Sequence, residues 1–343
     1  MDEEERRRKI RDFSFDKCKR GNQGFQRILL QLFGLTAHGK SSFINSVICA
    51  WFKSDYKNYA NAGDSEDLRT MGRRSYSLTK NIVLVDNRGC PTMNMYETGE
   101  IFAQLGNLLP LDQGVGWSKG FGLADRIVEA EPLVKASDFI IPIFVYRVTN
   151  NPSPNLKGEL TEIFKTAEEL TNVVPTVILT YKDHPNIRGV QTMFRDIGAV
   201  QIFAIENYTE KNPKRRRETE EEVISFLHGV ICDVEFQADL PRDADQEMMG
   251  RKWFVLNYIH TRELIIQKTN LEKQKLMAKQ KLEEDFRRKQ EEEERQKKQR
   301  RQSLQVRLEE MERDYDRLRS QDQRQFEQKM RELKNPKRSK PKN

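Results

Sequence analysis

The feature that most restricts the fold of this chain is a glycine-rich segment between an apolar run and a stretch with helical spacing. Residues 27–33 (Arg-Ile-Leu-Leu-Gln-Leu-Phe) predict a buried strand, and residues 41–52 predict a helix. The pattern GxxxxGK[ST] is matched between them by Gly34, Gly39, Lys40 and Ser41. A strand before the pattern and a helix after it are the context of a phosphate-binding loop, or P-loop. The alternative is a chance glycine-rich turn.

A P-loop works because several backbone N–H groups converge on phosphate oxygens, and the following helix presents its positive end to the same anion. Lys40 is expected to reach the β- and γ-phosphates, and the Ser41 hydroxyl to bind Mg²⁺. The residues expected around the nucleotide are Gly34, Thr36, Ala37, His38, Gly39, Lys40, Ser41 and Ser42. For His38 the expectation is an exposed loop side chain, with orientation toward the phosphates as the alternative.

A second element supports a magnesium nucleotide site. The apolar residues 82–85 run into Asp86-Asn87-Arg88-Gly89, a DxxG sequence at a strand end. Asp86 is expected to reach the Mg²⁺, and the Gly89 amide the γ-phosphate during hydrolysis. Thr70 is the candidate threonine that senses the γ-phosphate through Mg²⁺. Its alternatives are a loop threonine without a role, and Thr79 in its place.

Base recognition rests on two further strand ends. GTPases place [NT]KxD after a late strand, and this chain has Thr180-Tyr181-Lys182-Asp183-His184, in which the spacing is altered. Either Lys182 takes the lysine position and His184 falls where the base-reading aspartate belongs, or Asp183 reads the guanine and Tyr181 stacks on the base. We expect Thr180, Lys182 and Asp183 to contact the nucleotide, with guanine favoured over adenine. Asn207 follows the next predicted strand and either contacts the base or is a turn residue.

Two absences from the sequence predict slow turnover if the chain hydrolyses GTP at all. No glutamine closely follows Gly89, and no arginine lies inside the P-loop. Water positioning and stabilisation of transition-state charge account for most of the rate of phosphoryl transfer. The sequence therefore predicts a slow GTPase or nucleotide-dependent switch. A degenerate nucleotide-binding scaffold and an ATP-binding protein remain as alternatives.

These segments together resemble the interferon-induced protein 44 family of P-loop GTPase-like proteins, and more distantly the GIMAP-type GTPases and the septins. The resemblance covers about residues 24–232 and rests on residues 27–47, 75–78, 86–89, 100–109, 177–180 and 207–210. It implies a cytoplasmic GTP-binding protein connected with immunity, with GTP/GDP and Mg²⁺ as cofactors. The family pattern commonly reads DTPG and TKxD, so Asn87-Arg88 and residues 180–184 depart from it.

The alternation of strands and helices predicts an α/β fold: a P-loop GTPase-like domain with a mostly parallel sheet covered by helices on both faces. A long C-terminal helix with a coiled-coil seam is expected to follow it. The expected divisions are 1–25, a flexible charged segment; 26–232, the nucleotide domain; 233–250, a linker; 251–334, the long charged helix; and 335–343, a basic disordered tail.

The long helix is predicted because residues 252–333 contain neither proline nor glycine. The seam residues Leu304, Leu308, Met311, Tyr315 and Leu318 step by four and three, which is coiled-coil spacing. Phe326, Met330 and Leu333 continue the seam beyond Asp322, and residues 287–303 contain no apolar side chain. We expect self-association or a coiled-coil partner; a solvated helix that forms no stable dimer is the alternative.

Charge and composition bear on three other possibilities: membrane contact, nucleic-acid binding and secretion. The net charge of +7 and the basic clusters at 214–217 and 334–342 are compatible with weak contact to an anionic membrane. Aromatic residues are not interleaved with these clusters, which argues against nucleic acid. Four scattered cysteines and an N-terminus without an apolar run indicate neither a disulfide framework nor a signal peptide, so a soluble, cytoplasmic protein is expected.

Overall fold

The computed structural model describes residues 1–62, 72–89, 95–114, 121–149 and 154–334. The chain divides into two compact units, Met1–Ile266 and Gln267–Asn343. The strands are β1 (Arg27–Phe33), β2 (Gly72–Ser77), β3 (Ile82–Asp86), β4 (Gln113–Gly114), β5 (Asp138–Arg147), β6 (Thr176–Thr180) and β7 (Ile202–Ile205). The helices are α1 (Glu3–Arg11), α2 (Lys40–Phe52), α3 (Met95–Leu105), α4 (Phe121–Ala130), α5 (Pro154–Thr171), α6 (Ile187–Ile197), α7 (Arg217–Ala238) and α8 (Ala244–Lys334), with short 3₁₀ helices η1 (Phe15–Lys17) and η3 (Glu131–Leu133).

The first unit contains a seven-stranded sheet in the order β4-β2-β3-β1-β5-β6-β7. Strands β3, β1, β5, β6 and β7 are parallel, whereas β2 runs antiparallel to β3 and β4. The reversal at β2 follows from its short connection to β3, in which the Leu78 N–H donates to the Ile82 carbonyl. The predicted α/β class, with a mostly parallel sheet and a long C-terminal helix, is confirmed.

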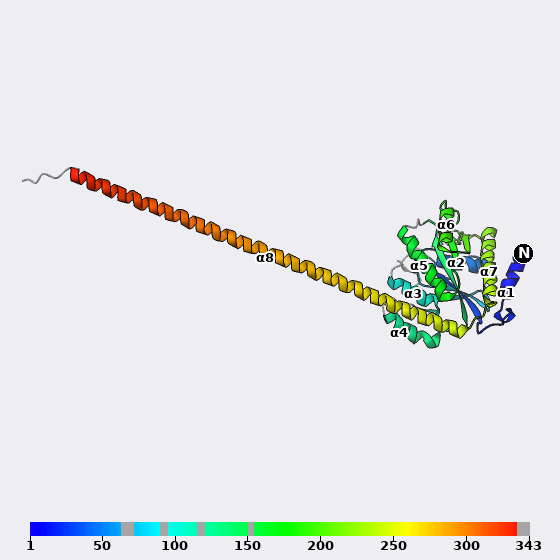
Figure 1. Ribbon diagram of the computed structural model, residues 1–343. Coiled ribbons are helices and arrows are strands. Elements are labelled where there is room, and N and C mark those ends of the chain that lie inside the picture. The colour runs from blue at the N-terminus through cyan, green and yellow to red at the C-terminus, as the bar shows by residue number, and fades with distance from the viewer. Residues whose placement is uncertain (63–71, 90–94, 115–120, 150–153, 335–343) are drawn as a thin grey trace, which may run out of the picture. The chain divides into compact units, whose positions relative to one another are not determined.

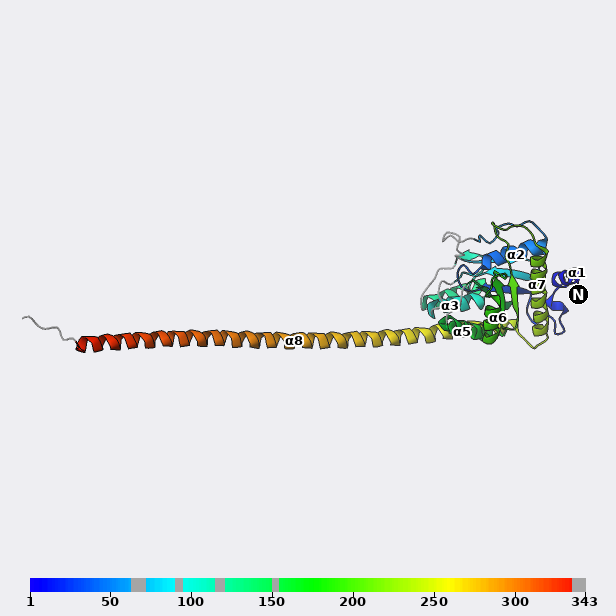
Figure 2. The same ribbon diagram turned by 90° about the horizontal axis from the view of Figure 1, so that it is seen from above.

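Helices cover both faces of the sheet because its central strands are apolar on both sides. In β5, Ile141 and Ile143 belong to one core and Phe144 and Tyr146 to the other. The first core is closed by α2 and α7, and the second by α3, α5 and α6 (Figures 1 and 2). This two-sided burial leaves the strand ends as the places where polar side chains of the sheet meet solvent.

The prediction that residues 1–25 form a flexible segment is wrong. Helix α1 lies beside α7 in Figure 1, and Ile10 and Phe15 are fully buried in the first core. The guanidinium of Arg7 donates to the carbonyls of Ala50 (3.0 Å) and Trp51 (3.0 Å) at the end of α2. A few apolar residues anchor this segment in the core. Because charged residues surround them in the sequence, the average composition of residues 1–25 does not indicate their burial.

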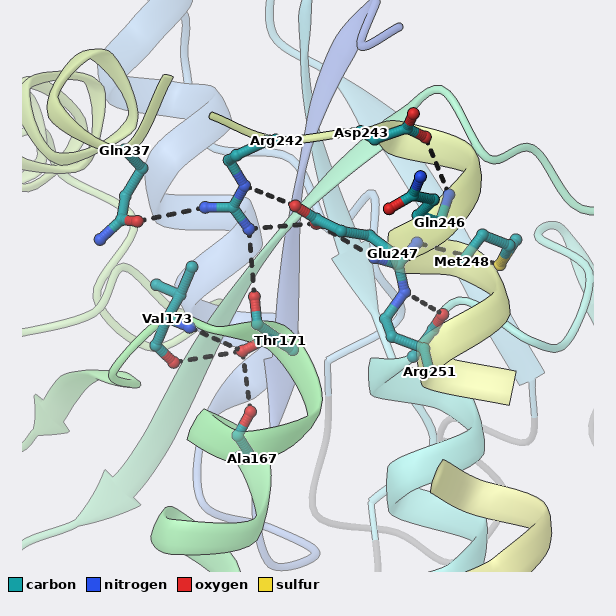
Figure 3. Close-up of polar contacts among 11 residues, drawn as sticks. Ala167, Thr171, Val173, Gln237, Arg242, Asp243, Gln246, Glu247, Met248 and Arg251 are labelled. Atoms are coloured by element: carbon teal, nitrogen blue, oxygen red, sulfur yellow. Dashed lines mark hydrogen bonds and ion pairs between the residues drawn. The ribbon is translucent and has the colours of Figure 1, made fainter. Parts of the chain in front are cut away.

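The prediction of a linker at residues 233–250 is also wrong. Helix α7 continues to Ala238 and α8 begins at Ala244, so only residues 239–243 connect them. Figure 3 shows how that connection is fixed: Arg242 binds both carboxylate oxygens of Glu247 (2.6 and 3.0 Å) and donates to Gln237 (3.1 Å). Val255 and Ile259 of α8 are buried in the second core, which places the beginning of the long helix within the first unit, Met1–Ile266.

The second unit is described as the continuation of α8 up to Lys334, and every residue from 267 to 332 is exposed. Throughout the described part of the chain, no helix combines the length and the apolar character that crossing a bilayer requires. The predicted basic tail, residues 335–343, lies outside the described residues.

Candidate functional site

The predicted P-loop connects β1 to α2 at the carboxyl edge of the sheet. Two residues take backbone conformations that favour glycine: Gly34 has φ +138° and Gly39 has φ +92°. A Cβ at Gly34 would lie 2.6 Å from the carbonyl oxygen of Val145 in β5, so the loop passes directly over the neighbouring strand. Ala37, between them, also has a positive φ of +61°. Residues 34–39 therefore form a tight, left-handed turn around the start of α2.

The Lys40 ammonium lies beneath this loop. Its Nζ donates to the carbonyl oxygens of Gly34 (3.2 Å) and Leu35 (2.9 Å), and the side chain is buried. A Cβ at Gly89 would lie 2.8 Å from the same Nζ and 3.2 Å from the Cα of Thr36. A side chain at position 89 would therefore displace the Lys40 ammonium and press against the P-loop backbone.

Ser41, in the first turn of α2, and Asp86, the last residue of β3, bring two side-chain oxygens together. The pairing of Leu32 with Asp86 between β1 and β3 places the end of β3 beside the P-loop. There the Ser41 hydroxyl donates to Asp86 Oδ2 over 2.7 Å. A hydroxyl and a carboxylate at this spacing suit a hard cation such as Mg²⁺, which takes one or two protein ligands and completes its shell with water and phosphate oxygens. The structure thus places Ser41 and Asp86, two of the three residues predicted to bind the metal, within hydrogen-bonding distance of each other.

His38 differs from its prediction as an exposed loop residue. Its side chain is 4% exposed, its Nδ1 accepts the backbone N–H of Arg147 (3.2 Å), and its ring meets the edge of Tyr146. Burial, reinforced by the charges of Lys40 and Arg147, lowers the pKa of His38 to about 3. The imidazole is therefore neutral at physiological pH, with its proton on Nε2.

Thr180 and Asn207 contact the P-loop backbone. Thr180 Oγ1 donates to the carbonyl of His38 (3.2 Å), and Asn207 Nδ2 donates to the carbonyl of Gly39 (3.4 Å). A Cβ at Gly39 would lie 3.1 Å from Thr180 Cγ2 and 3.2 Å from Asn207 Nδ2. These two residues, predicted to contact the nucleotide, are arranged to position the loop that would hold its phosphates.

The side chains of Lys182 and Asp183 have different surroundings in the structure. Lys182 Nζ forms ion pairs with Glu218 (2.6 Å) and Glu222 (2.8 Å) of α7. Burial lowers the pKa of Lys182, but these hydrogen bonds outweigh it and raise the pKa overall. Asp183 is exposed on the turn after β6, where its charge faces Glu206 at the end of β7. Of the two, Asp183 is the one placed at the surface beside the strand ends.

Sequence reasoning did not single out Glu206 or Arg147, which lie near Asp183 and Tyr181. Glu206 is half-buried, and burial, followed by the charge of Asp183, raises its pKa. Tyr181 has a positive φ of +63° and an exposed ring, over which the Arg147 guanidinium lies 4.6 Å from the centroid. In the sequence, the one indication of a role for Glu206 is that it directly follows a strand. Together these groups form a flat cationic–aromatic surface beside two carboxylates.

The DxxG segment is held by a buried polar network that the sequence did not reveal. The fully buried Arg73 of β2 donates to Asn87 Oδ1 (2.9 Å) and Gln31 Oε1 (3.1 Å), and Asn87 Nδ2 donates to the same Gln31 oxygen (2.9 Å). Arg73 also donates to Asn107 Oδ1 (3.2 Å) and to the Leu109 carbonyl. Burial lowers the pKa of Arg73 to about 9. Asn87, one of the departures from the family pattern, is therefore a structural residue.

The remaining predicted site residues are placed as follows. Ser42 lies in the first turn of α2, directly after the magnesium candidate Ser41. Thr70, predicted both to sense the γ-phosphate and to bind Mg²⁺, lies outside the described residues. Within the part of the chain that is described, no cluster of three or more His, Cys, Asp or Glu side chains is arranged to hold a metal. Mg²⁺ would therefore depend on nucleotide oxygens as well as on Ser41 and Asp86.

Comparison with known proteins gave no relative from which a role could be transferred: no protein-family model matches the chain, and no curated protein matches it.

Proposed function

We propose that the chain binds Mg²⁺ with GTP or GDP in a P-loop GTPase-like domain, hydrolyses GTP slowly, and responds to the bound nucleotide as a switch. The observation that carries this proposal is the convergence of Lys40, the Ser41–Asp86 pair and Gly89 at one point on the P-loop. An ammonium, a metal-binding oxygen pair and a backbone amide are the groups that a β,γ-phosphate with its metal requires.

The position of the site in the sheet supports the same proposal. Strand β1 has β3 on one side and β5 on the other, so the chain order reverses at β1. In open α/β sheets, ligands bind outside the carboxyl ends of the strands at such a reversal. The P-loop begins at the carboxyl end of β1. The α2 helix starts at Lys40 and directs its N-terminal amides toward the same place.

Guanine is favoured by the acidic pair at the ends of β6 and β7. Asp183 and Glu206 offer acceptors, and guanine presents donors at both N1 and the 2-amino group. Adenine presents a single amino donor and an acceptor at N1. The exposed Tyr181 ring, covered by Arg147, offers a flat surface against which a purine is able to stack. This assignment concerns the base, so it is independent of the phosphate site.

Nucleotide binding to the full chain tests the proposal. Fluorescent GTP, GDP and ATP are titrated with Mg²⁺ and with excess chelator, using the parent chain, Lys40→Ala and Lys165→Ala. Lys165 lies on α5 in an exposed ion pair with Glu169, so its variant controls for the loss of a positive charge. We expect Lys40→Ala to weaken GTP binding by about 100-fold or more, because hydrogen bonds to charged groups contribute roughly 1.5–3 kcal/mol each. Equal affinity of Lys40→Ala and the parent would refute the site, and tighter binding of ATP than of GTP would refute guanine.

A nucleotide-holding scaffold is the second candidate, and one observation favours it. Arg73, Gln31 and Asn87 tie the DxxG segment into the buried interior, which opposes movement on loss of the γ-phosphate. Nucleotide exchange separates the two functions. A switch exchanges GDP for GTP and changes its protease sensitivity, whereas a scaffold retains its nucleotide and has the same cleavage pattern in both states.

A further inference from the structure

The seam of α8 is an apolar stripe on an otherwise charged helix. Its five members, spaced four and three residues apart, are between 56% and 68% exposed: Leu304, Leu308, Met311, Tyr315 and Leu318. Side chains at this spacing line up along one face of a helix. A continuous exposed stripe of this kind marks an interaction surface.

The spacing also assigns heptad positions. A step of four residues leads from position d to position a, so Leu304, Met311 and Leu318 occupy d, and Leu308 and Tyr315 occupy a. The positions that flank such a seam are e and g, and four of the five within residues 304–319 carry charge. The g positions are Arg307 and Asp314, the charged e positions are Glu312 and Arg319, and the remaining e position is the neutral Gln305.

We propose that residues 304–319 pair with the same residues of a second copy of this chain as a parallel, in-register two-stranded coiled coil. In a parallel pair, each g residue faces the e residue five positions further along the other helix. Arg307 then faces Glu312 of the second copy, and Asp314 faces Arg319 of the second copy. Symmetry repeats both contacts, so the seam is flanked by four attractive pairs.

The opposite orientation buries the seam less completely. An antiparallel pair sets position a against position d, and two registers each keep four of the five seam residues together. With Leu308 against Leu318 of the second copy, Leu304 meets Asp322, and Asp314 and Glu312 each meet the same residue of the other copy, which is repulsive. With Leu308 against Met311 of the second copy, Arg307 meets Asp314, but Leu318 meets Arg301. The parallel, in-register pair gives all five seam residues an apolar partner together with four attractive flanking pairs, so burial and charge both favour it.

The contacts that the four charged flanking side chains make within one chain do not prevent them from pairing with a second copy. Arg307, Glu312, Asp314 and Arg319 are all exposed. Asp314 lies 3.5 Å from Arg317 of its own helix, and both groups remain in water, so exchanging that contact costs little. The seam is bounded by residues 287–303, which contain no apolar side chain, and by the charged Asp322. A seam of this length gives a weak dimer whose population depends on concentration.

Charge reversal on the full chain tests the pairing. Sedimentation equilibrium is measured for the parent, Arg307→Glu, and the double variant Arg307→Glu/Glu312→Arg, each without nucleotide. We expect Arg307→Glu to raise the dimer Kd by about tenfold, which corresponds to about 1.4 kcal/mol, and the double variant to restore it within about threefold. A monomeric parent, an unaffected single variant, or a double variant as weak as the single one would each overturn the proposal.

A cysteine experiment tests the direction. Leu304→Cys should form an intermolecular disulfide under mild oxidation, because a parallel pair places the two copies of residue 304 side by side. An antiparallel pair that buries the seam separates them by at least about 11 residues, or roughly 16 Å along the helix. Val306→Cys, at the outward position f, is the matched control, and the parent chain accounts for its native cysteines. Cross-linking of Val306→Cys at the same rate, or none for Leu304→Cys, would contradict the parallel arrangement. None of this depends on the proposed nucleotide function, since a variant that loses GTP binding retains the seam.

Discussion

The buried histidine of the P-loop makes the stability of the first unit depend on pH in a way that one substitution isolates. His38 has a pKa of about 3 in the folded chain, against 6.5 for a histidine in water, because burial and two nearby cations oppose its charged form. Between these values the unfolded chain binds a proton that the folded chain does not. Stability contributed by the neutral imidazole is therefore present above the unfolded pKa and decreases as pH falls below it.

The magnitude follows from the two pKa values. Lowering the pH from 7 to 5 takes the unfolded imidazole from mostly neutral to almost fully protonated, while the folded imidazole stays neutral. Proton linkage then removes about 2 kcal/mol from the free energy of unfolding. That is a substantial part of the stability of an ordinary domain. The substitution His38→Asn removes the titrating group and retains a side-chain acceptor for the Arg147 N–H.

Urea unfolding followed by tryptophan fluorescence is the suitable assay. The three tryptophans are Trp51, Trp117 and Trp253, so the signal comes from the unit Met1–Ile266 and not from the remainder of the long helix. We expect the parent to lose about 2 kcal/mol more than His38→Asn between pH 7 and pH 5. The other histidines and the carboxylates titrate in both proteins and cancel in this comparison. Identical pH dependence in the two proteins would show that His38 is accessible to protons, and the buried geometry would be wrong.

Two further substitutions test the interior and the loop. Arg73→Met should destabilise the first unit by roughly 3 kcal/mol in urea unfolding, because it leaves several buried acceptors without their donor; Arg74→Met, the exposed neighbour on β2, should change stability by less than about 0.5 kcal/mol, and equal effects would contradict the buried network. Gly39→Ala should weaken GTP binding by about tenfold or more, because φ is +92° and the added Cβ meets Thr180 at 3.1 Å; Gly158→Ala on α5, where a Cβ meets nothing within 4 Å, should bind normally, and unchanged affinity of Gly39→Ala would count against a fixed loop.

The parts of the fold that the sequence predicted are those encoded locally. The succession of β1, a glycine-containing loop and α2 was predicted because each of the three is encoded by neighbouring residues. The contact between Ser41 and Asp86 was predictable for a similar reason, since both follow the ends of apolar strands that are adjacent in a parallel sheet.

The failures concern burial that depends on distant partners. Residues 1–25 are rich in charge, so their average composition indicates a solvated segment, yet Ile10 and Phe15 reach the core. The environment of Lys182 is set by Glu218 and Glu222, which lie more than thirty residues away along the chain. His38 gives no sequence signal of burial, because its cover comes from β5. Propensity and periodicity describe a residue's own segment, and none of these positions is determined there.

The role of Asn87, where the chain departs from the DTPG pattern, is likewise set by residues that are distant in the sequence. Against the family motif, an asparagine there indicates lost function. In the structure its amide joins Arg73 and Gln31 in one hydrogen-bonded group, and Gln31 is a fully buried polar residue in β1. A buried arginine separated from its partners leaves several polar groups unsatisfied, so this group resists partial rearrangement. If the proposed nucleotide site is correct, movement of residues 86–89 on loss of a γ-phosphate would have to carry Asn87 with it. The strength of the Arg73 network would then decide between the proposed switch and the proposed scaffold.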